Sequence, residues 1–191
     1  MKRQDVPQRN SPLTSAQQAM VALWVEHLRG EFTTCNTQDT LATMIEEAEV
    51  THIPVLTGGV GKAQLQEFYS QRFIPQMPPD TENLLIARTV GTDRIVDELL
   101  LRFTHTISMD WMLPGIPPTG KRVEVPLVVC VQFLDGKMAS EHIYWDQASV
   151  LVQLGVLDTA RLPVVGIEQA RKILDPTIPA NRLIERAEQR K

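Results

Sequence analysis

The chain has 191 residues, of which 43% are hydrophobic and 22% charged, and its formal net charge is −4. This composition is typical of a globular protein, and it excludes a disordered chain, a collagen and a low-complexity repeat. Basic residues are mixed with acidic ones rather than gathered into a stripe, so we expect no nucleic-acid partner. No apolar run approaches the roughly 20 residues that a membrane span needs, so we expect no membrane association.

The cysteines and the first residues bear on the compartment. Cys35 and Cys130 stand alone, without the spacing of a metal site or a redox motif. Isolated cysteines are typical of reduced thiols, which predicts a cytoplasmic protein. Residues 1–14 are polar and lack the apolar segment of a signal peptide, so we expect a flexible N-terminal arm.

Three helices are expected in the first part of the chain. A capping-box pattern at Ser15–Gln18 begins the first, which should end near Gly30. The apolar stripe in residues 41–48 has helical spacing and predicts the second. The glycine turn at 57–61 opens the third, and Pro75 stops it.

Beyond residue 80 the period of the hydrophobic pattern changes to that of strands. Residues 84–90, 95–108, 123–133 and 137–147 are strand-like, and Asp135-Gly136 is a tight hairpin signal. Further helices are expected at 148–154, 166–174 and 180–190. The order predicts an α+β fold: three N-terminal helices against a strongly curved antiparallel sheet, cone-shaped, with a C-terminal helical extension.

Aromatic residues are unevenly placed. There are 3 Trp, 2 Tyr and 5 Phe; the first is Trp24, and none follows Trp145. Because aromatic side chains supply much of the area of a core or pocket, we expect core and site within about residues 15–155.

Several familiar site motifs are incomplete. Gly58-Gly-Val-Gly-Lys62 lacks the spacing and the hydroxyl of a phosphate loop, and no Gly-x-Ser-x-Gly elbow is present. The histidines show no spacing of metal ligands, so we expect neither a metal nor a cofactor. They are His27, His52, His105 and His142.

The strand at 137–147 carries the most informative side chains. Alternation puts His142, Tyr144 and Asp146 on one face. If this face lines an apolar cavity, burial raises the pKa of Asp146 toward the range of a general acid or base. The alternative is that Asp146 caps the helix that begins near Gln147, a role that aspartate favours.

Other aromatic and imidazole groups are candidates for the same site. His105 follows Phe103 on an apolar strand face, where it is either a hydrogen-bonded core residue or a pocket residue. The candidate substrate-binding residues are His142, Tyr144, Trp111, Trp24, Phe103 and Tyr69.

A set of motifs recurs in a recognisable order along the chain. They are Trp24, His52, Phe103-Thr-His105, Gly115-Ile-Pro-Pro-Thr-Gly120, Asp135-Gly-Lys137, Glu141, Asp146 and Gln153-Leu-Gly155. In this order the sequence resembles the SnoaL-like polyketide cyclase (ester cyclase) group of the nuclear transport factor 2-like superfamily. The resemblance covers roughly residues 15–157, which leaves 158–191 as an extension.

The resemblance implies a cone-shaped fold around a deep apolar pocket, with a homodimer through the outer face of the sheet. It also implies an aspartate general acid/base, without metal or cofactor, acting on an enolisable ester. Asp146 stands at that position, and His52 and His105 stand where pocket histidines are common. His142 replaces the tryptophan usual in the group, which implies a more polar pocket.

Three functions remain open from the sequence. The first is a cofactor-independent cyclase, isomerase or lyase in which Asp146 moves a proton next to a carbonyl and His105, His52 or Tyr144 hydrogen-bonds the enolate oxygen. The second is a non-catalytic protein that binds a small apolar ligand. The third is a scaffold whose sheet face or C-terminal tail recruits another protein.

Overall fold

The computed structural model describes residues 12–189, so most of the expected N-terminal arm lies outside the described residues. Its centre is one six-stranded sheet, with strand order β2-β1-β6-β5-β4-β3. All neighbouring strands are antiparallel except β1 and β6, so the sheet is mixed rather than wholly antiparallel. The strands are β1 (Met44–His52), β2 (Thr57–Val60), β3 (Glu82–Val90), β4 (Arg94–Thr104), β5 (Arg122–Leu134) and β6 (Lys137–Trp145).

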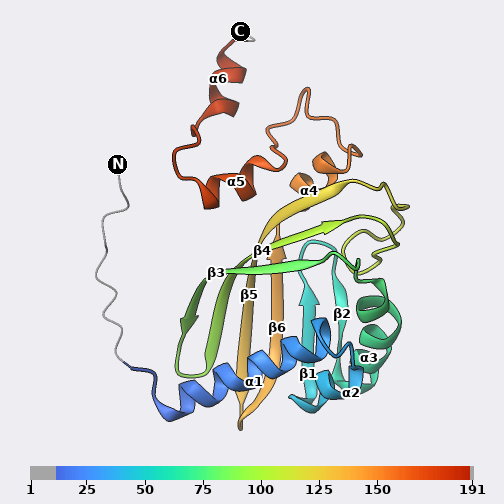
Figure 1. Cartoon of the computed structure of the whole chain (residues 1–191), viewed down its shortest axis with the longest axis vertical. Helices are drawn as coiled ribbons and strands as arrows, with labels where there is room; N and C mark the ends of the chain where they lie inside the picture. Colours follow the sequence, from blue (N-terminus) through green and yellow to red (C-terminus); the bar gives the residue numbers. More distant parts are fainter. Residues whose placement is uncertain (1–11, 190–191) are drawn as a thin grey trace.

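Three helices cover one side of the curved sheet. They are α1 (Ser15–Phe32), α2 (Thr37–Ala42) and α3 (Gly61–Phe68). Figure 1 shows α1 lying across the sheet, with α2 and α3 beside β1 and β2. The capping box that begins α1 is formed by Thr14 and Gln17, one residue before the expected Ser15–Gln18 pattern, and Ser15 is the first residue of the helix. The helix buries Met20, Trp24 and His27. The expected α+β cone is therefore confirmed, although the sheet stays open at β2 and β3.

The expected second helix over residues 41–48 is wrong. Helix α2 ends at Ala42, and β1 begins at Met44 and inserts between β2 and β6. A β-bulge between Met44 and Glu49 interrupts the alternation of buried and exposed residues. This irregular spacing is what makes the segment look helical in the sequence, and strand pairing overrides the local pattern.

The long β5–β6 hairpin follows the expectation. Asp135 and Gly136 both have positive φ, 50° and 74°, as a two-residue turn between right-twisted strands requires. Along β6, Glu141, Ile143 and Trp145 are buried, whereas Tyr144 is exposed. From Glu141 onward the pleat therefore points the odd-numbered residues of β6 toward the helices.

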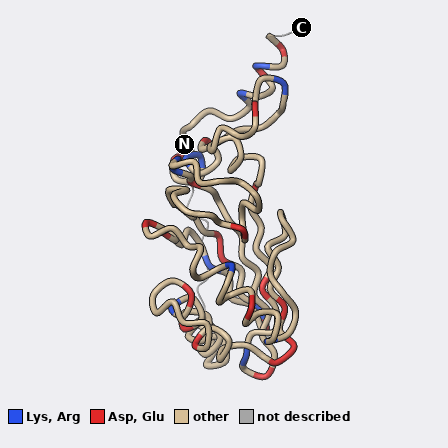
Figure 2. Tube along the Cα trace, turned by 90° about the vertical axis from the view of Figure 1, so that its right-hand side faces the viewer, with Lys and Arg blue, Asp and Glu red and all other residues tan. Residues whose placement is uncertain are grey.

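The C-terminal part is helical, with α4 (Gln147–Gln153), α5 (Glu168–Leu174) and α6 (Arg182–Glu188). The α5 helix packs on its own chain through the buried Ala170, and Ser149 Oγ donates to the Gly166 carbonyl at 2.8 Å. Helix α6 buries no residue and lies apart from the sheet (Figures 1 and 2).

Charged residues are mixed along the described part of the chain, as expected from the sequence. Figure 2 shows Lys and Arg interspersed with Asp and Glu along the trace. Over residues 12–189, no helix has the length and apolar character to cross a membrane. Cys35 and Cys130 are both free thiols.

Candidate active site

A small cavity lies between α1, the sheet and a π-helical turn at Tyr69–Phe73 that follows α3. Its volume is about 50 Å³. Most of its wall is apolar and aromatic, and the carboxyl groups of Glu31 and Glu141 are part of that wall. The aromatic lining residues are Trp24, Phe32, His52, Tyr69, Phe73 and Trp111.

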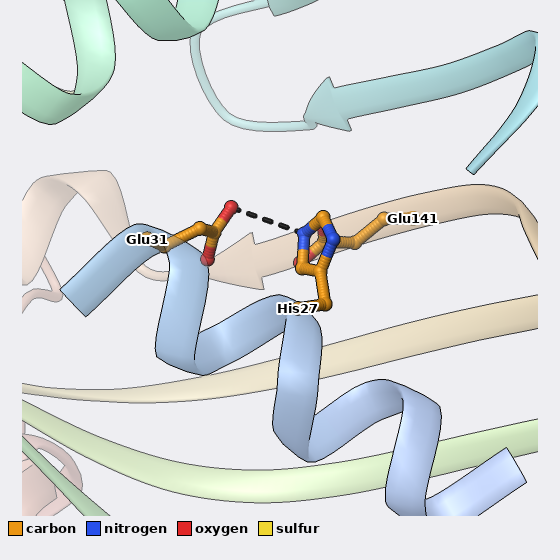
Figure 3. A group of neighbouring side chains, drawn as sticks. All are labelled: His27, Glu31 and Glu141. Atoms are coloured by element: carbon orange, nitrogen blue, oxygen red, sulfur yellow. Dashed lines mark ion pairs between the residues drawn. The ribbon is translucent and has the colours of Figure 1, made fainter. Parts of the chain in front are cut away.

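A histidine and two carboxyl groups meet beside this cavity. His27 Nε2 lies 3.2 Å from Glu31 Oε1 and 3.6 Å from Glu141 Oε2. His27 and Glu31 come from successive turns of α1, and Glu141 reaches them from β6 (Figure 3). All three are at least 95% buried, with exposed fractions of 0%, 4% and 5%. Three ionisable groups therefore share one site shielded from water.

Thr43 fixes the orientation of His27. Its hydroxyl donates to the Thr40 carbonyl at 2.6 Å, so its oxygen is left to accept from His27 Nδ1, 2.8 Å away. His27 Nδ1 therefore carries a proton, and Nε2 is the atom turned toward the carboxyl groups. The Tyr69 hydroxyl lies 3.4 Å from the same Nε2.

Burial and charge shift the pKa values in opposite directions at this cluster. Burial alone would lower the pKa of His27, but the two glutamates beside it raise that pKa to about 10. Burial raises the pKa of Glu141; His27 opposes this rise and Glu31 adds to it. Burial likewise raises the pKa of the Tyr69 hydroxyl.

Glu141 has spare hydrogen-bonding capacity. Its Oε2 is buried, and among the described residues no donor lies within hydrogen-bond distance of it. Its ion-pair partner, His27 Nε2, is 3.6 Å away and thus beyond hydrogen-bond distance, so this oxygen can still accept a proton, a ligand or a cation.

His52 is a different kind of buried histidine. Its ring lies among those of Phe68, Phe73, Trp111 and Trp145, with centroids 5.4–5.8 Å apart. Burial lowers its pKa to about 4, so the ring is neutral near pH 7. Since the Thr57 carbonyl, 3.3 Å away, can only accept, His52 Nδ1 is the donor and Nε2 is left as an acceptor.

No protein-family model matches the sequence, and no curated protein matches it. Solved structures do match. One is described as a SnoaL-like polyketide cyclase from Jannaschia sp. CCS1, with a TM-score of 0.64 and 19% identity over 78% of this chain and 99% of that one. Another is a protein with a ketosteroid isomerase-like fold from Catenulispora acidiphila, in complex with trimethylamine. Its TM-score is 0.54, with 13% identity over 71% of this chain and 93% of that one. The chain has the NTF2-like fold of the SnoaL-like proteins.

A further match is AclR from Streptomyces galilaeus, described as a hydroxylase, with a TM-score of 0.58 and 19% identity over 74% of this chain and 99% of that one. Identities this low establish the fold and leave the chemistry to be argued from the site. Within the NTF2-like fold the cavity lies between the helices and the concave face of the sheet. Glu31 and Glu141 of the cluster are among the residues that line the cavity of this chain.

Four residues expected from the sequence line this cavity: His52, Trp24, Tyr69 and Trp111. Phe103 and His105 are fully buried but lie outside the cavity wall. His105 Nδ1 contacts Thr119, and its Nε2 has no partner among the described residues. Burial lowers the pKa of His105, so it is a neutral core histidine.

The face of β6 expected to line the cavity points the other way. Tyr144 is 42% exposed, and His142 lies on the outer face of the sheet, 3.6 Å from Glu49 Oε1. Asp146 caps α4: its Oδ1 accepts from the amides of Ala148 and Ser149 at 2.9 and 3.3 Å. Its Oδ2 accepts from Gln169 on α5. These contacts correspond to the capping alternative.

The sequence interpretation missed the three ionisable residues of the site. The signal in the sequence is the spacing of His27 and Glu31, four positions apart on a helix, which pairs a histidine with a carboxylate rather than with a second histidine. Alternation along β6 puts Glu141 on the face opposite to Asp146, and this face, rather than that of Asp146, lines the cavity. Alternation shows which residues share a face and leaves undecided which face is inside.

Proposed function

We propose that the protein is a small-molecule enzyme of the SnoaL-like type, in which Glu141 moves a proton on an enolisable carbonyl or ester substrate. The reaction class is cyclase, isomerase or lyase. The observation that carries the proposal is the buried Oε2 of Glu141, which has no hydrogen-bond donor among residues 12–189 and belongs to a residue that lines an aromatic cavity. We assign this role to Glu141 rather than to Asp146, because the carboxylate of Asp146 already accepts hydrogen bonds from residues of α4 and α5.

The surroundings of Glu141 suit proton transfer. A general base works best when its pKa lies near the operating pH, and burial shifts the pKa of Glu141 upward from its ordinary value. His27, held by Thr43, supplies a fixed positive charge on one side of the carboxylate. This charge would balance the negative charge that passes between Glu141 and an enolate.

Two other cavity residues have complementary roles in the proposal. The Tyr69 hydroxyl is a donor beside His27 and would hydrogen-bond the enolate oxygen. His52, with its Nδ1 proton committed to Thr57, offers an acceptor and would orient a hydroxyl or N–H of the substrate. The cavity volume of about 50 Å³ is small beside the roughly 150 Å³ of an engineered cavity that binds benzene. The substrate is thus a compact molecule, or the cavity widens as it binds.

Similar structures support a small-molecule site. Their descriptions include polyketide cyclases and complexes with trimethylamine and polyporic acid. A second candidate is a non-catalytic protein that holds a small apolar ligand in the same cavity. It is favoured by the hydrogen bonds that the carboxylate of Asp146 accepts from Ala148 and Gln169, because they leave Asp146 as a helix cap.

Hydrogen–deuterium exchange separates the two functions. The α-protons of small ketones and esters are followed by NMR in D₂O, with wild-type protein, Glu141→Gln and Asp146→Asn. The proposal predicts exchange that falls about 10²- to 10⁴-fold in Glu141→Gln and persists in Asp146→Asn. Binding of these compounds without any exchange supports the binding protein. Exchange lost only in Asp146→Asn contradicts the role of Glu141.

The proposal also includes a homodimer through the outer face of the sheet. Val96, Val128 and Tyr144 are 37%, 40% and 42% exposed there, on three neighbouring strands. Exposed apolar side chains on adjacent strands favour association. Light scattering after size-exclusion chromatography should give twice the chain mass, and Val128→Glu should halve it; an unaltered mass in that variant contradicts this interface.

A further inference from the structure

We propose that His27, Glu31 and Glu141 form a binding site for one divalent cation of the zinc type. Each residue offers one ligand atom, and these atoms all lie within 4.8 Å of one another. Donors at about 2.1 Å from a tetrahedral ion are separated by about 3.4 Å. The separations of His27 Nε2 from the two glutamate oxygens, 3.2 and 3.6 Å, bracket that value.

The histidine is oriented as a metal ligand is. Metal-binding imidazoles use one nitrogen for the ion and donate the other N–H to a neighbouring acceptor, which fixes the tautomer. His27 Nδ1 has this acceptor in Thr43, whose own proton goes to the Thr40 carbonyl. Nε2 is therefore the nitrogen that lies near both carboxyl groups, and Figure 3 marks its ion pair with Glu31.

Glu141 gives an independent indication of a missing ligand. The His27–Glu31 pair belongs to one helix, and Glu141 reaches it from the sheet with an exposed fraction of 5%. Among the described residues, no hydrogen-bond donor reaches its Oε2. A cation between the three residues would satisfy this oxygen.

Charge and donor type select the ion. A metal ion at Nε2 takes the place of the proton that His27 carries there in metal-free protein. Two carboxylates and the imidazole left neutral then balance a divalent cation, which matters in a cavity with aromatic walls because an uncompensated buried charge is costly. One nitrogen and two oxygens suit Zn²⁺ or Co²⁺, whereas Mg²⁺ retains several waters that this cavity has little room for. Glu31 and Glu141 line the cavity, whose volume of about 50 Å³ admits a water molecule as a fourth ligand.

The cation site does not rest on the proposed enzymatic function, but the two exclude each other at Glu141, because a metal ion would occupy the oxygen that is proposed to take the proton. Binding is therefore measured directly, by calorimetry with zinc chloride and by the visible absorption of bound Co²⁺, on full-length protein first treated with a chelator. Metal binding and deuterium exchange of the protons next to the substrate carbonyl are measured separately, so the loss of one can be distinguished from the loss of the other.

Matched variants identify the site. Glu31→Gln and Glu141→Gln preserve side-chain shape and should abolish one-to-one zinc binding. Glu26→Gln, an exposed residue on the same helix, should leave it unchanged. Thr43→Val should weaken binding about 10- to 100-fold by releasing the orientation of His27. Circular dichroism and melting of each metal-free variant verify that it is folded.

Two results overturn the proposal. One is the absence of saturable zinc or cobalt binding to the folded wild-type protein. The other is binding that persists in Glu31→Gln and Glu141→Gln but disappears in His142→Asn or Cys35→Ser, which would place the ion on the surface.

Discussion

His27 and His52 are both buried near Glu141, yet their pKa values lie on opposite sides of that of free histidine, at about 10 and about 4. Burial lowers the pKa of both rings. His27 also contacts two carboxyl groups, which outweigh its burial, whereas His52 is surrounded by aromatic rings. The same fold therefore holds one histidine charged and the other neutral.

This contrast predicts a maximum of stability near pH 6.5 in metal-free protein. The stabilisation from His27 is fully present below the pKa of the unfolded state and is lost as pH rises toward about 10. Glu141, whose pKa is also raised, loses stabilisation in the same direction, as pH rises above its ordinary pKa of 4.5. His52 acts in the other direction: the unfolded chain binds its proton below about pH 6.5, so stability falls as pH drops toward about 4.

Urea denaturation at pH 5, 6.5 and 9, with a chelator present, measures this dependence. The variant His52→Phe retains an aromatic ring. In it, the free energy of unfolding should fall less between pH 6.5 and pH 5 than in wild type, and its fall between pH 6.5 and pH 9 should be unchanged. An acid limb as steep in His52→Phe as in wild type would show that other groups cause it.

The capping role of Asp146 leads to a prediction about stability. Asp146→Ala should lower the free energy of unfolding by about 0.5–2 kcal/mol, because the amides of Ala148 and Ser149 lose their acceptor. Asp146→Asn should cost less, since asparagine is an equally good cap. Thermal melts of both variants test this, and equal losses in both would indicate that the negative charge matters rather than the cap.

Trp24 is positioned by a buried charge. Its Nε1 donates to Asp97 Oδ2 at 2.8 Å, and Arg88 contacts both oxygens of the same carboxylate at 2.7 and 2.6 Å. Asp97 is fully buried. Asp97→Asn should therefore cost about 3 kcal/mol and alter tryptophan fluorescence, because the partly buried guanidinium of Arg88 loses its counter-charge.

The surface pair Arg29–Glu26 is the control for that prediction. Its side chains are about half exposed, so Glu26→Gln should change stability by no more than about 0.5 kcal/mol. A similar small effect of Asp97→Asn would contradict the importance assigned to the buried pair.

Gly58 is required by the β1–β2 hairpin. It has φ +136°, and a Cβ atom there would lie 1.9 Å from the Val50 carbonyl oxygen. Gly120 also has positive φ, +68°, but open space around it. Gly58→Ala should therefore destabilise by clearly more than the roughly 1 kcal/mol expected of Gly120→Ala, as measured by urea denaturation. Equal effects would mean that the hairpin adjusts to the added methyl group.

Local sequence determined much of the fold. The capping box before α1, the Asp135-Gly136 turn and the alternation along β5 act through neighbouring residues, so the α+β order could be predicted. The segment from Met44 could not, because its bulge hides the alternation and its strand forms only by pairing with β6.

The candidate site depended on tertiary structure. The sequence places Glu141 and Asp146 on opposite faces of one strand, and the spacing of His27 and Glu31 places them on one face of a helix. Only the packing of α1 against the inner face of β6 turns Glu141 toward that pair and leaves Asp146 to cap α4. Side-chain alternation is a property of the backbone, whereas the choice of the inner face is made by the elements that cover the sheet.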